Sequence, residues 1–373
     1  MQTHPRAETS AMTNRQRIRA CIDGKPLDRF PVWLKMDNPT WRTPQPQDVR
    51  TMDGPALLAA AGCDLMLGNF LRCDCSRPRV EEDCEEDPDR RVRTWSTPDG
   101  DLTAKWSKDP YTNSWHPVEY PVKSVDDLRR LRWLFEGNEY SVCSNTAAVH
   151  AACQRELEAM DAFTIAGIGP GPLMDMVEHQ CGPETAIFMM ADEPELFEQT
   201  LQIMHQDRMK LLRALLPHLR ADTFWLTENT STTLISPAIF REHCMPHLRD
   251  YGSLILEHGV IPVHHMCGAL HALLEMIDEL PALVNEAYTT RPLGDVSLAE
   301  GRTRMPAKCL LGGTNATLWM SEPEEIVATV AADLDQCPDR RKIFLTSAGV
   351  LPAGVSITKA RAVTDRLKKL PAG

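Results

Sequence analysis

Eight short stretches rich in β-branched and aromatic residues alternate with longer amphipathic stretches along this 373-residue chain. A strand followed by a helix that returns the chain to the next strand builds a parallel sheet. Eight such units close a parallel sheet into a (β/α)₈ barrel with the helices outside. The sequence therefore predicts an α/β fold of the TIM-barrel class. The expected strands are residues 30–34, 63–69, 162–167, 222–227, 259–265, 282–288, 308–313 and 342–347.

The connection between the second and third expected strands is longer than the others. Residues alternate in polarity on both sides of Pro98-Asp99-Gly100, a pattern typical of a β-hairpin. We interpret residues 70–160, approximately, as an insertion near the barrel mouth. A separate domain is not needed to explain it.

The chain as a whole is expected to form a single domain. Thr13 is followed by an apolar period close to 3.6, which predicts an N-terminal helix capped by that residue. The polar residues 1–12 are expected to be disordered, and residues 13–373 to form the barrel with its helical extension and insertion.

Charge and composition exclude several classes of function. Lys and Arg number 40 against 52 Asp and Glu, a formal charge of −12, which disfavours binding to nucleic acid or an anionic membrane. The sequence contains neither a spanning apolar run nor a signal peptide, so a cytoplasmic protein is expected. Its 12 cysteines are scattered, and most are expected to be reduced thiols. A small molecule or a protein is the expected partner.

The stretch V-H-H-M-C-G, residues 263–268, is the strongest chemical signal. Side chains two residues apart in a strand point to the same face, so His265 and Cys267 can converge while His264 points away. Imidazole and thiolate suit zinc, but a catalytic zinc site usually has three protein ligands. Two such residues at a strand end are also compatible with an ordinary structural role.

We expect a third metal ligand at the C-terminal end of a neighbouring strand, because the functional groups of these barrels lie there. Glu228 ends the strand before V-H-H-M-C-G and is expected to act as third ligand or proton donor, with His265 as the other catalytic residue. Cys73 and Cys75 form a less favoured alternative for metal. Other polar residues near strand ends are expected to bind substrate: Asp37, Asn229, Asn285, Glu286, Asn315 and Ser347.

Four stretches resemble the uroporphyrinogen decarboxylase superfamily, and within it the corrinoid-linked methyltransferases. They are TNRQRIRACIDGKPLDRFPVW, LISPAIFREHCMPHLRDY, VHHMCG and LLGGTNATLWMSEPEEI. The likeness covers nearly the whole chain and implies the same (β/α)₈ barrel. Authentic decarboxylases carry an arginine-rich R-Q-A-G-R stretch after the first strand, whereas residues 34–39 here read L-K-M-D-N-P. The resemblance therefore favours the methyltransferase branch.

In that branch, the resemblance implies that His265 and Cys267 hold zinc. Its members usually add a cysteine after the last strand, but residues 346–352 contain none. The ligand assignment implied by the family therefore stops at these two residues.

These observations predict a zinc-dependent methyltransferase that moves a methyl group between a small O-, N- or S-methyl compound and a corrinoid protein or thiol acceptor. The corrinoid is assigned to a partner protein because the sequence lacks the Asp-x-His-x-x-Gly motif of carriers. The resemblance also suggests a homodimer. Two alternatives stay open: a metal-independent decarboxylase or lyase on the same fold, and a non-catalytic protein that binds a corrinoid or metal.

Overall fold

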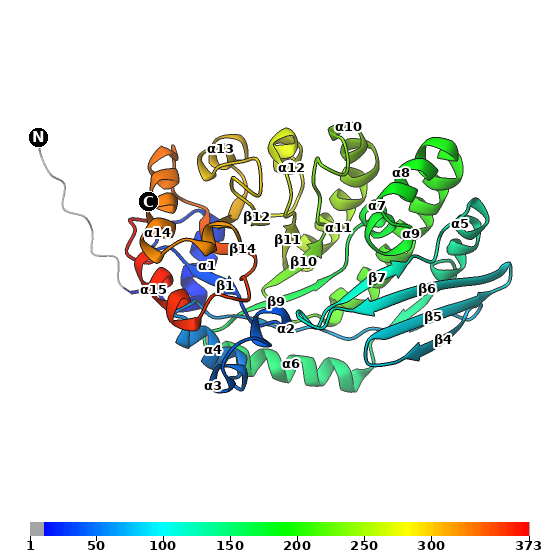
Figure 1. The fold of residues 1–373 in the computed structure, drawn as a ribbon, viewed down its shortest axis with the longest axis horizontal. Helices are drawn as coiled ribbons and strands as arrows, with labels where there is room; N and C mark the ends of the chain where they lie inside the picture. The colour runs from blue at the N-terminus through cyan, green and yellow to red at the C-terminus, as the bar shows by residue number, and fades with distance from the viewer. Residues whose placement is uncertain (1–10, 373) are drawn as a thin grey trace, which may run out of the picture.

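The computed structural model describes residues 11–372, and its central feature is an eight-stranded parallel barrel (Figure 1). The strands follow the order β1-β14-β13-β12-β11-β10-β9-β2, so every neighbouring pair except β1 and β2 shares a ladder. Each predicted strand region overlaps one of these strands, which confirms the (β/α)₈ class. Their bounds are β1 Val32–Lys35, β2 Met66–Gly68, β9 Phe163–Ile168, β10 Thr223–Thr227, β11 Ile261–His265, β12 Val284–Tyr288, β13 Cys309–Gly313 and β14 Ile343–Val350.

Helices surround the barrel, and their apolar faces pack against the outer side of its strands. Two single π-helical turns, Met176–Gln180 and Phe240–Cys244, follow α7 and α10. The α-helices are α1 Asn14–Asp23, α2 Pro39–Arg42, α3 Gln47–Arg50, α4 Gly54–Ala60, α5 Val125–Leu131, α6 Ser144–Ala159, α7 Pro172–Asp175, α8 Pro183–Asp192, α9 Pro194–Leu215, α10 Pro237–Ile239, α11 Met245–Glu257, α12 Leu274–Asp278, α13 Leu298–Arg304, α14 Pro323–Gln336 and α15 Ile357–Leu367.

Helix α1 closes the N-terminal end of the barrel. Thr13 caps it in a capping box with Gln16, as the sequence predicts. Its buried Ile18 and Ile22 belong to the same core cluster as the side chains inside the barrel. The disorder expected at the start of the chain lies, for residues 1–10, outside the described residues. With α1 at one end, the opposite end is the mouth where these folds place their chemistry.

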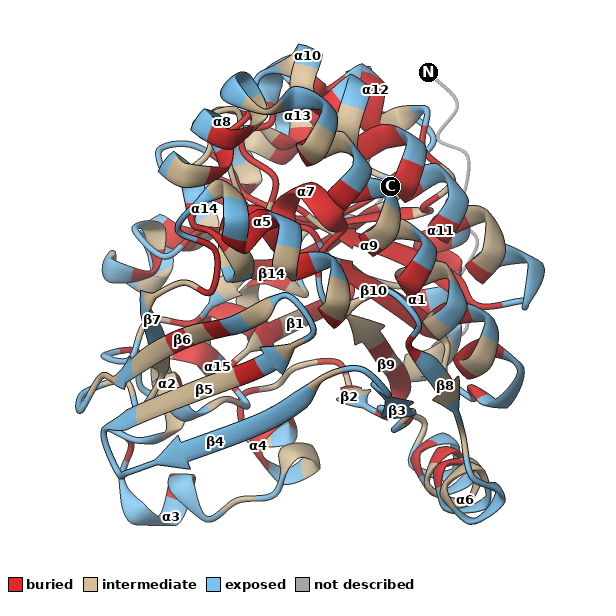
Figure 2. Cartoon of the chain, turned by 90° about the vertical axis from the view of Figure 1, so that its right-hand side faces the viewer, coloured by how far each residue is buried: buried red, intermediate tan, exposed pale blue. Residues whose placement is uncertain are grey.

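The insertion after β2 forms two antiparallel sheets. The hairpin predicted around Pro98-Asp99-Gly100 is confirmed, since Thr97 pairs with Gly100. Figure 1 places the larger sheet at the end of the molecule opposite α1, and Figure 2 shows its outer strand β4 exposed. The smaller sheet pairs β3 Asp74–Ser76 with β8 Glu139–Ser141; the larger contains β4 Glu81–Glu86, β5 Arg90–Thr97, β6 Gly100–Lys108 and β7 Trp115–Glu119.

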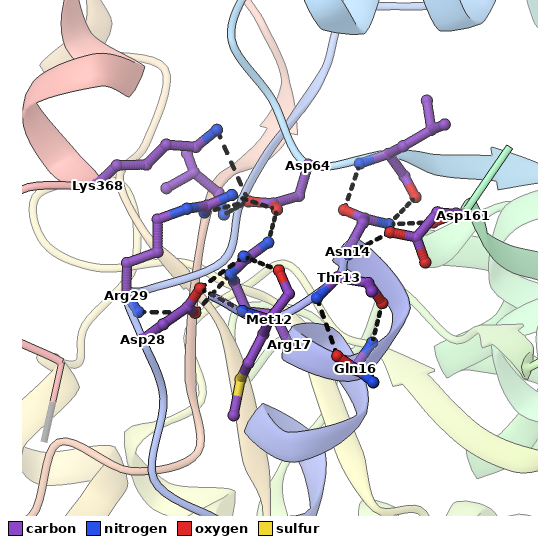
Figure 3. A network of polar contacts seen from close by, with 12 residues as sticks. Met12, Thr13, Asn14, Gln16, Arg17, Asp28, Arg29, Asp64, Asp161 and Lys368 are labelled. Atoms are coloured by element: carbon purple, nitrogen blue, oxygen red, sulfur yellow. Dashed lines mark hydrogen bonds and ion pairs between the residues drawn. The ribbon is translucent and has the colours of Figure 1, made fainter. Parts of the chain in front are cut away.

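A buried ionic network joins β1 to β2 where the ladder is missing (Figure 3). The amide of Val32 donates to the Asp64 carboxylate at 2.8 Å, and the Asp64 amide donates to the Val32 carbonyl at 2.7 Å. The same carboxylate pairs with Arg17 at 3.0 Å and Arg29 at 2.7 Å, and Lys368 of α15 lies 4.0 Å away. Burial opposes ionisation of Asp64, but the Arg29 hydrogen bonds and charge outweigh it and lower its pKa.

No helix within the described part of the chain has the length and apolar character needed to cross a membrane.

Replacing Asp64 with Asn is expected to lower the free energy of unfolding by about 3 kcal/mol at pH 7, because the buried Arg17 and the half-buried Arg29 lose the carboxylate that they share. The advantage of the wild type is fully present above the ordinary Asp pKa of 3.8 and disappears as pH falls through the lowered folded value. Urea unfolding at several pH values measures both effects. Asp126→Asn, which removes an exposed partner of Arg129, is the control and should cost under about 0.5 kcal/mol.

Candidate active site

Three charged side chains meet inside the barrel at its mouth. His265 and Glu286 lie two positions beyond Val263 and Val284, which belong to the core inside the barrel. Because alternate residues of a strand share a face, His265 and Glu286 also point inward. Lys35 ends β1 and reaches both of them. We call Lys35, His265 and Glu286 the mouth cluster.

The contacts of the mouth cluster centre on the Glu286 carboxylate, which is fully buried. One carboxylate oxygen hydrogen-bonds Nδ1 of His265, and the other forms an ion pair with Nζ of Lys35. Nζ of Lys35 also lies 3.2 Å from Nδ1 of His265 and 5.6 Å from the centre of the Trp225 ring. Each member of the cluster therefore contacts both others.

The protonation states follow from these contacts. Burial disfavours the imidazolium of His265, but the charge of Glu286 and hydrogen bonds to Cys267 and Glu286 outweigh it and raise the pKa to about 9. Burial likewise disfavours the Glu286 carboxylate, but the charges of Lys35 and His265 lower its pKa. At neutral pH the His265 imidazolium and the Glu286 carboxylate are therefore both charged and face each other.

Cys267 lies at the rim of the same site. It is exposed, and its thiol donates to Oδ1 of Asn229 at 3.5 Å. The Asn229 amide in turn donates to Glu178 at 2.9 Å, and its backbone has a left-handed φ of 47°. Burial raises the pKa of Glu178. Glu178 is absent from the sequence prediction because it lies in a π-helical turn, which no simple periodicity reveals.

Glu228 lies on the other side of the barrel wall. It shares a strand face with Phe224 and Leu226, which pack in the outer core, whereas Trp225 belongs to the inner core. One carboxylate oxygen accepts from the Gly171 amide at 2.7 Å, and the other is buried without a hydrogen-bond partner among the described residues. Burial raises the pKa of Glu228 to about 8. The structure does not bring Glu228 to His265 and Cys267.

The remaining predicted substrate-binding residues make separate contacts. Asp37 lies at the mouth and pairs with Arg42 at 2.7 Å. Ser347 accepts a hydrogen bond from the Lys35 amide at 3.1 Å and so ties β1 to β14. Asn315 donates to the Arg291 carbonyl at 3.0 Å and holds a loop.

Asn285 and the Cys73, Cys75 pair also lie apart from the mouth cluster. Asn285 precedes the inward-facing Glu286 in β12, so its side chain points to the opposite face of the strand. It is buried and has no side-chain hydrogen bond within residues 11–372. Cys73 donates to the Ser141 carbonyl at 3.4 Å, and Cys75 is exposed on β3. Cys73 and Cys75 belong to the insertion, at the small sheet formed by β3 and β8.

A cavity of about 280 Å³ opens beside Lys35 between the ends of β1 and β2. It occupies the place where these two strands share no ladder, so we call it the seam pocket. Its walls are mainly apolar and include Trp33, Met66, Phe70 and Ile165. Lys35 is the member of the mouth cluster that contributes to its wall.

The donor set does not complete a zinc site. Glu286 engages Nδ1 of His265, which leaves Nε2 as the nitrogen that a metal would use, and Cys267 adds a thiol. A catalytic zinc usually has three protein ligands. Within residues 11–372, however, no three His, Cys, Asp or Glu side chains are placed to share a metal ion. We therefore derive the chemistry from the side chains themselves.

Comparison with known proteins identifies the family. The sequence profile of uroporphyrinogen decarboxylase (URO-D) matches residues 114–370, more than half of the chain. The chain belongs to the uroporphyrinogen decarboxylase family. No curated protein matches its sequence.

Solved structures show the same fold at low sequence identity. A methyltransferase from Methanosarcina mazei superposes with a TM-score of 0.60 at 15% identity, covering 95% of this chain and 98% of that one. A B12-independent methionine synthase from a Shewanella species gives a TM-score of 0.41 at 12% identity, covering 85% and 88%. The first likeness confirms the barrel predicted from the sequence.

Replacing Glu228 with Gln is expected to stabilise the protein increasingly as pH rises. Between the ordinary value of 4.5 and about 8, folded Glu228 keeps a proton that the unfolded chain has released, so the wild type loses stability across that range. Gln keeps the bond from Gly171 without this penalty. We expect a gain of about 3 kcal/mol at pH 8 in urea unfolding, and almost none at pH 4.

The control for this experiment is Glu184→Gln, which changes an exposed acid of α8 and should leave the stability nearly constant with pH. Equal stability of Glu228→Gln and wild type at both pH 4 and pH 8 would show that Glu228 ionises freely in the folded protein.

Proposed function

We propose that this family member is a methyltransferase that takes a methyl group from a small methylated compound at the barrel mouth. The observation that carries the proposal is the mouth cluster beside the seam pocket. The cluster holds a charged imidazole that is fixed by a buried carboxylate, and its third member, Lys35, lines a cavity for a small molecule. An acid of this kind can protonate a heteroatom that would otherwise leave as an anion when its methyl group is transferred.

The reaction can be written with this chain's own groups. An electron pair of the acceptor forms a bond to the methyl carbon while the bond from that carbon to the substrate heteroatom breaks. The electron pair of the broken bond stays on the heteroatom, which takes a proton from His265. Glu286 and Lys35 hold the imidazolium in place and stabilise the charge that develops.

Two further observations support methyl transfer. The Methanosarcina mazei protein with the same fold is a methyltransferase and matches nearly the whole chain. The arginine-rich stretch that authentic decarboxylases use for substrate carboxylates is replaced here by residues 34–39, which include Lys35. The site is thus arranged for a substrate with fewer anionic groups.

The acceptor belongs to the same proposal. A corrinoid carried by a partner protein, or a thiol, would approach the methyl carbon opposite the mouth cluster. The substrate can carry its methyl group on oxygen, nitrogen or sulfur. The cytoplasmic location and the homodimer expected from the sequence stay predictions.

A metal-independent decarboxylase or lyase is the second candidate, and the incomplete donor set favours it. The cations of the mouth cluster can hold a carboxylate as well as a leaving heteroatom. The two candidates differ in product, because a decarboxylase releases carbon dioxide and leaves every methyl group in place. Mass balance of a ¹³C-methyl substrate separates them.

His265→Asn is expected to lower methyl transfer at least ~100-fold, because the variant has no imidazolium to protonate the leaving group. The assay follows a panel of ¹³C-methyl donors with cob(I)alamin as acceptor, by NMR. In the wild type the rate should fall as pH rises through about 9, where His265 loses its proton. His218→Asn, at an exposed histidine, is the control. A wild-type rate that rises through pH 9 would remove His265 from the acid role.

Zinc can be tested directly. We expect less than about half an equivalent in protein purified from zinc-replete cells, because two protein donors hold the metal weakly. The measurement is elemental analysis of the wild type beside the double variant His265→Ala, Cys267→Ala. One full equivalent in the wild type, lost in the double variant, would restore the zinc-dependent mechanism that the sequence resemblance implies.

A further inference from the structure

Another cavity, of about 170 Å³, lies outside the barrel where the insertion meets helix α9. Residues three and four positions apart lie side by side on one face of a helix. One such face of α9 lines the cavity with Met204, Asp207, Arg208 and Leu211. Residues of the insertion and of α7 form the rest of its wall. We call this cavity the junction pocket.

Arg208 has unused hydrogen-bond donors at this pocket. Its side chain is 17% exposed, and its Nη2 atom donates to the Pro170 carbonyl at 3.0 Å and to Asp175 at 3.3 Å. Within residues 11–372 its Nε and Nη1 atoms have no hydrogen-bond acceptor, and both atoms are accessible to solvent. Such donors form strong charge-assisted hydrogen bonds with an oxyanion.

The two carboxylates of the junction pocket are engaged by donors of the chain itself. Asp175 accepts from Gln180 at 2.9 Å as well as from Arg208. Asp207 accepts from the Tyr140 hydroxyl at 2.7 Å, and burial raises its pKa. The other oxygen of Asp207 has no partner among the described residues, but it is sealed from solvent, so a ligand does not reach it. The groups left open to a ligand are therefore the donors of a cation.

The insertion adds a second basic residue and apolar surface. Arg77 follows β3 and lines the pocket; its Nη1 atom pairs with Glu82 at 3.2 Å, and 37% of its side chain is exposed. Phe135, Met204 and Leu211 contribute apolar side chains to the wall. The volume equals that of about six water molecules at roughly 30 Å³ each, so a ligand has fewer than about ten non-hydrogen atoms. Such a ligand combines one oxyanion with a short hydrocarbon part.

We propose that the junction pocket is a binding site for a small organic carboxylate. The carboxylate group accepts hydrogen bonds from Arg208 and Arg77, and the hydrocarbon part packs against Phe135 and Leu211. A bound molecule contacts both the insertion and α9, and so holds these two parts of the chain together. The inference is independent of the proposed methyl transfer, because no residue of the mouth cluster lines this pocket.

The test is a ¹⁹F NMR titration of the full chain with 4,4,4-trifluorobutyrate and, separately, with its neutral amide, 4,4,4-trifluorobutyramide. The two probes have nearly the same shape and differ in charge. We expect the carboxylate to bind at least about tenfold more tightly than the amide, because hydrogen bonds between charged groups are stronger than those of a neutral acceptor.

Substitutions then locate the bound probe. Arg208→Gln should weaken carboxylate binding at least ~10-fold, and Arg77→Gln, at the more exposed arginine, about threefold. Asp207→Asn keeps an acceptor for Tyr140 and removes an opposing charge, so it should tighten binding about threefold. Arg72→Gln is the control, because this side chain is 84% exposed and lies outside the pocket wall. Circular dichroism checks that each variant is folded.

Any of four results overturns the inference. One is the absence of saturable binding of either probe, and another is equal affinity for the carboxylate and the amide. Wild-type affinity in Arg77→Gln and in folded Arg208→Gln would place the probe elsewhere. Displacement of the probe by an equal concentration of inorganic phosphate would show that the apolar wall plays no part. If Arg208→Gln does not fold, the opposite shifts expected for Arg77→Gln and Asp207→Asn decide the question.

Discussion

The buried carboxylate of Asp64 fixes the geometry on which the mouth depends. It binds Arg17 of α1, Arg29 before β1 and the Val32 amide, so one side chain closes the barrel at its N-terminal end. Beyond this point β1 and β2 share no ladder. The two strands are therefore held together at one end and are free to separate at the other, where the seam pocket lies. A complete ladder along this seam would remove the space for a substrate.

The mouth cluster depends on the same arrangement, because Lys35 is the last residue of β1. Its backbone amide donates to Ser347 of β14, which sets the end of the strand, while its side chain crosses the barrel to Glu286 of β12. Removing either cation would leave Glu286 buried without full compensation, so the cluster stabilises the fold as well as the chemistry. Effects of substitution at Lys35 or Glu286 on activity must therefore be read beside their effects on stability.

Much of this architecture follows from sequence patterns, and the departures have physical causes. Eight strands, the hairpin and the Thr13 cap are local features with clear periodicity or capping chemistry, and all are confirmed. The mouth cluster is only partly predicted, because His265 and Glu286 lie in strands with a readable pattern whereas Lys35 lies in a four-residue strand. Glu178 comes to the site through a π-helical turn, which depends on packing more than on spacing.

Which groups can react at this mouth depends more on the face of the strand to which a side chain points than on how close the residue lies to the strand end. The register aligns Thr227 with His265 and His265 with Glu286, and this row faces the barrel interior. The neighbouring row, which pairs His264 with Asn285, is also polar and buried, yet neither side chain has a hydrogen bond among the described residues. Burial lowers the pKa of His264 to about 3, whereas Glu286 keeps His265 charged. Two adjacent histidines of one strand therefore hold opposite protonation states, and the difference comes from which side of the sheet carries the carboxylate.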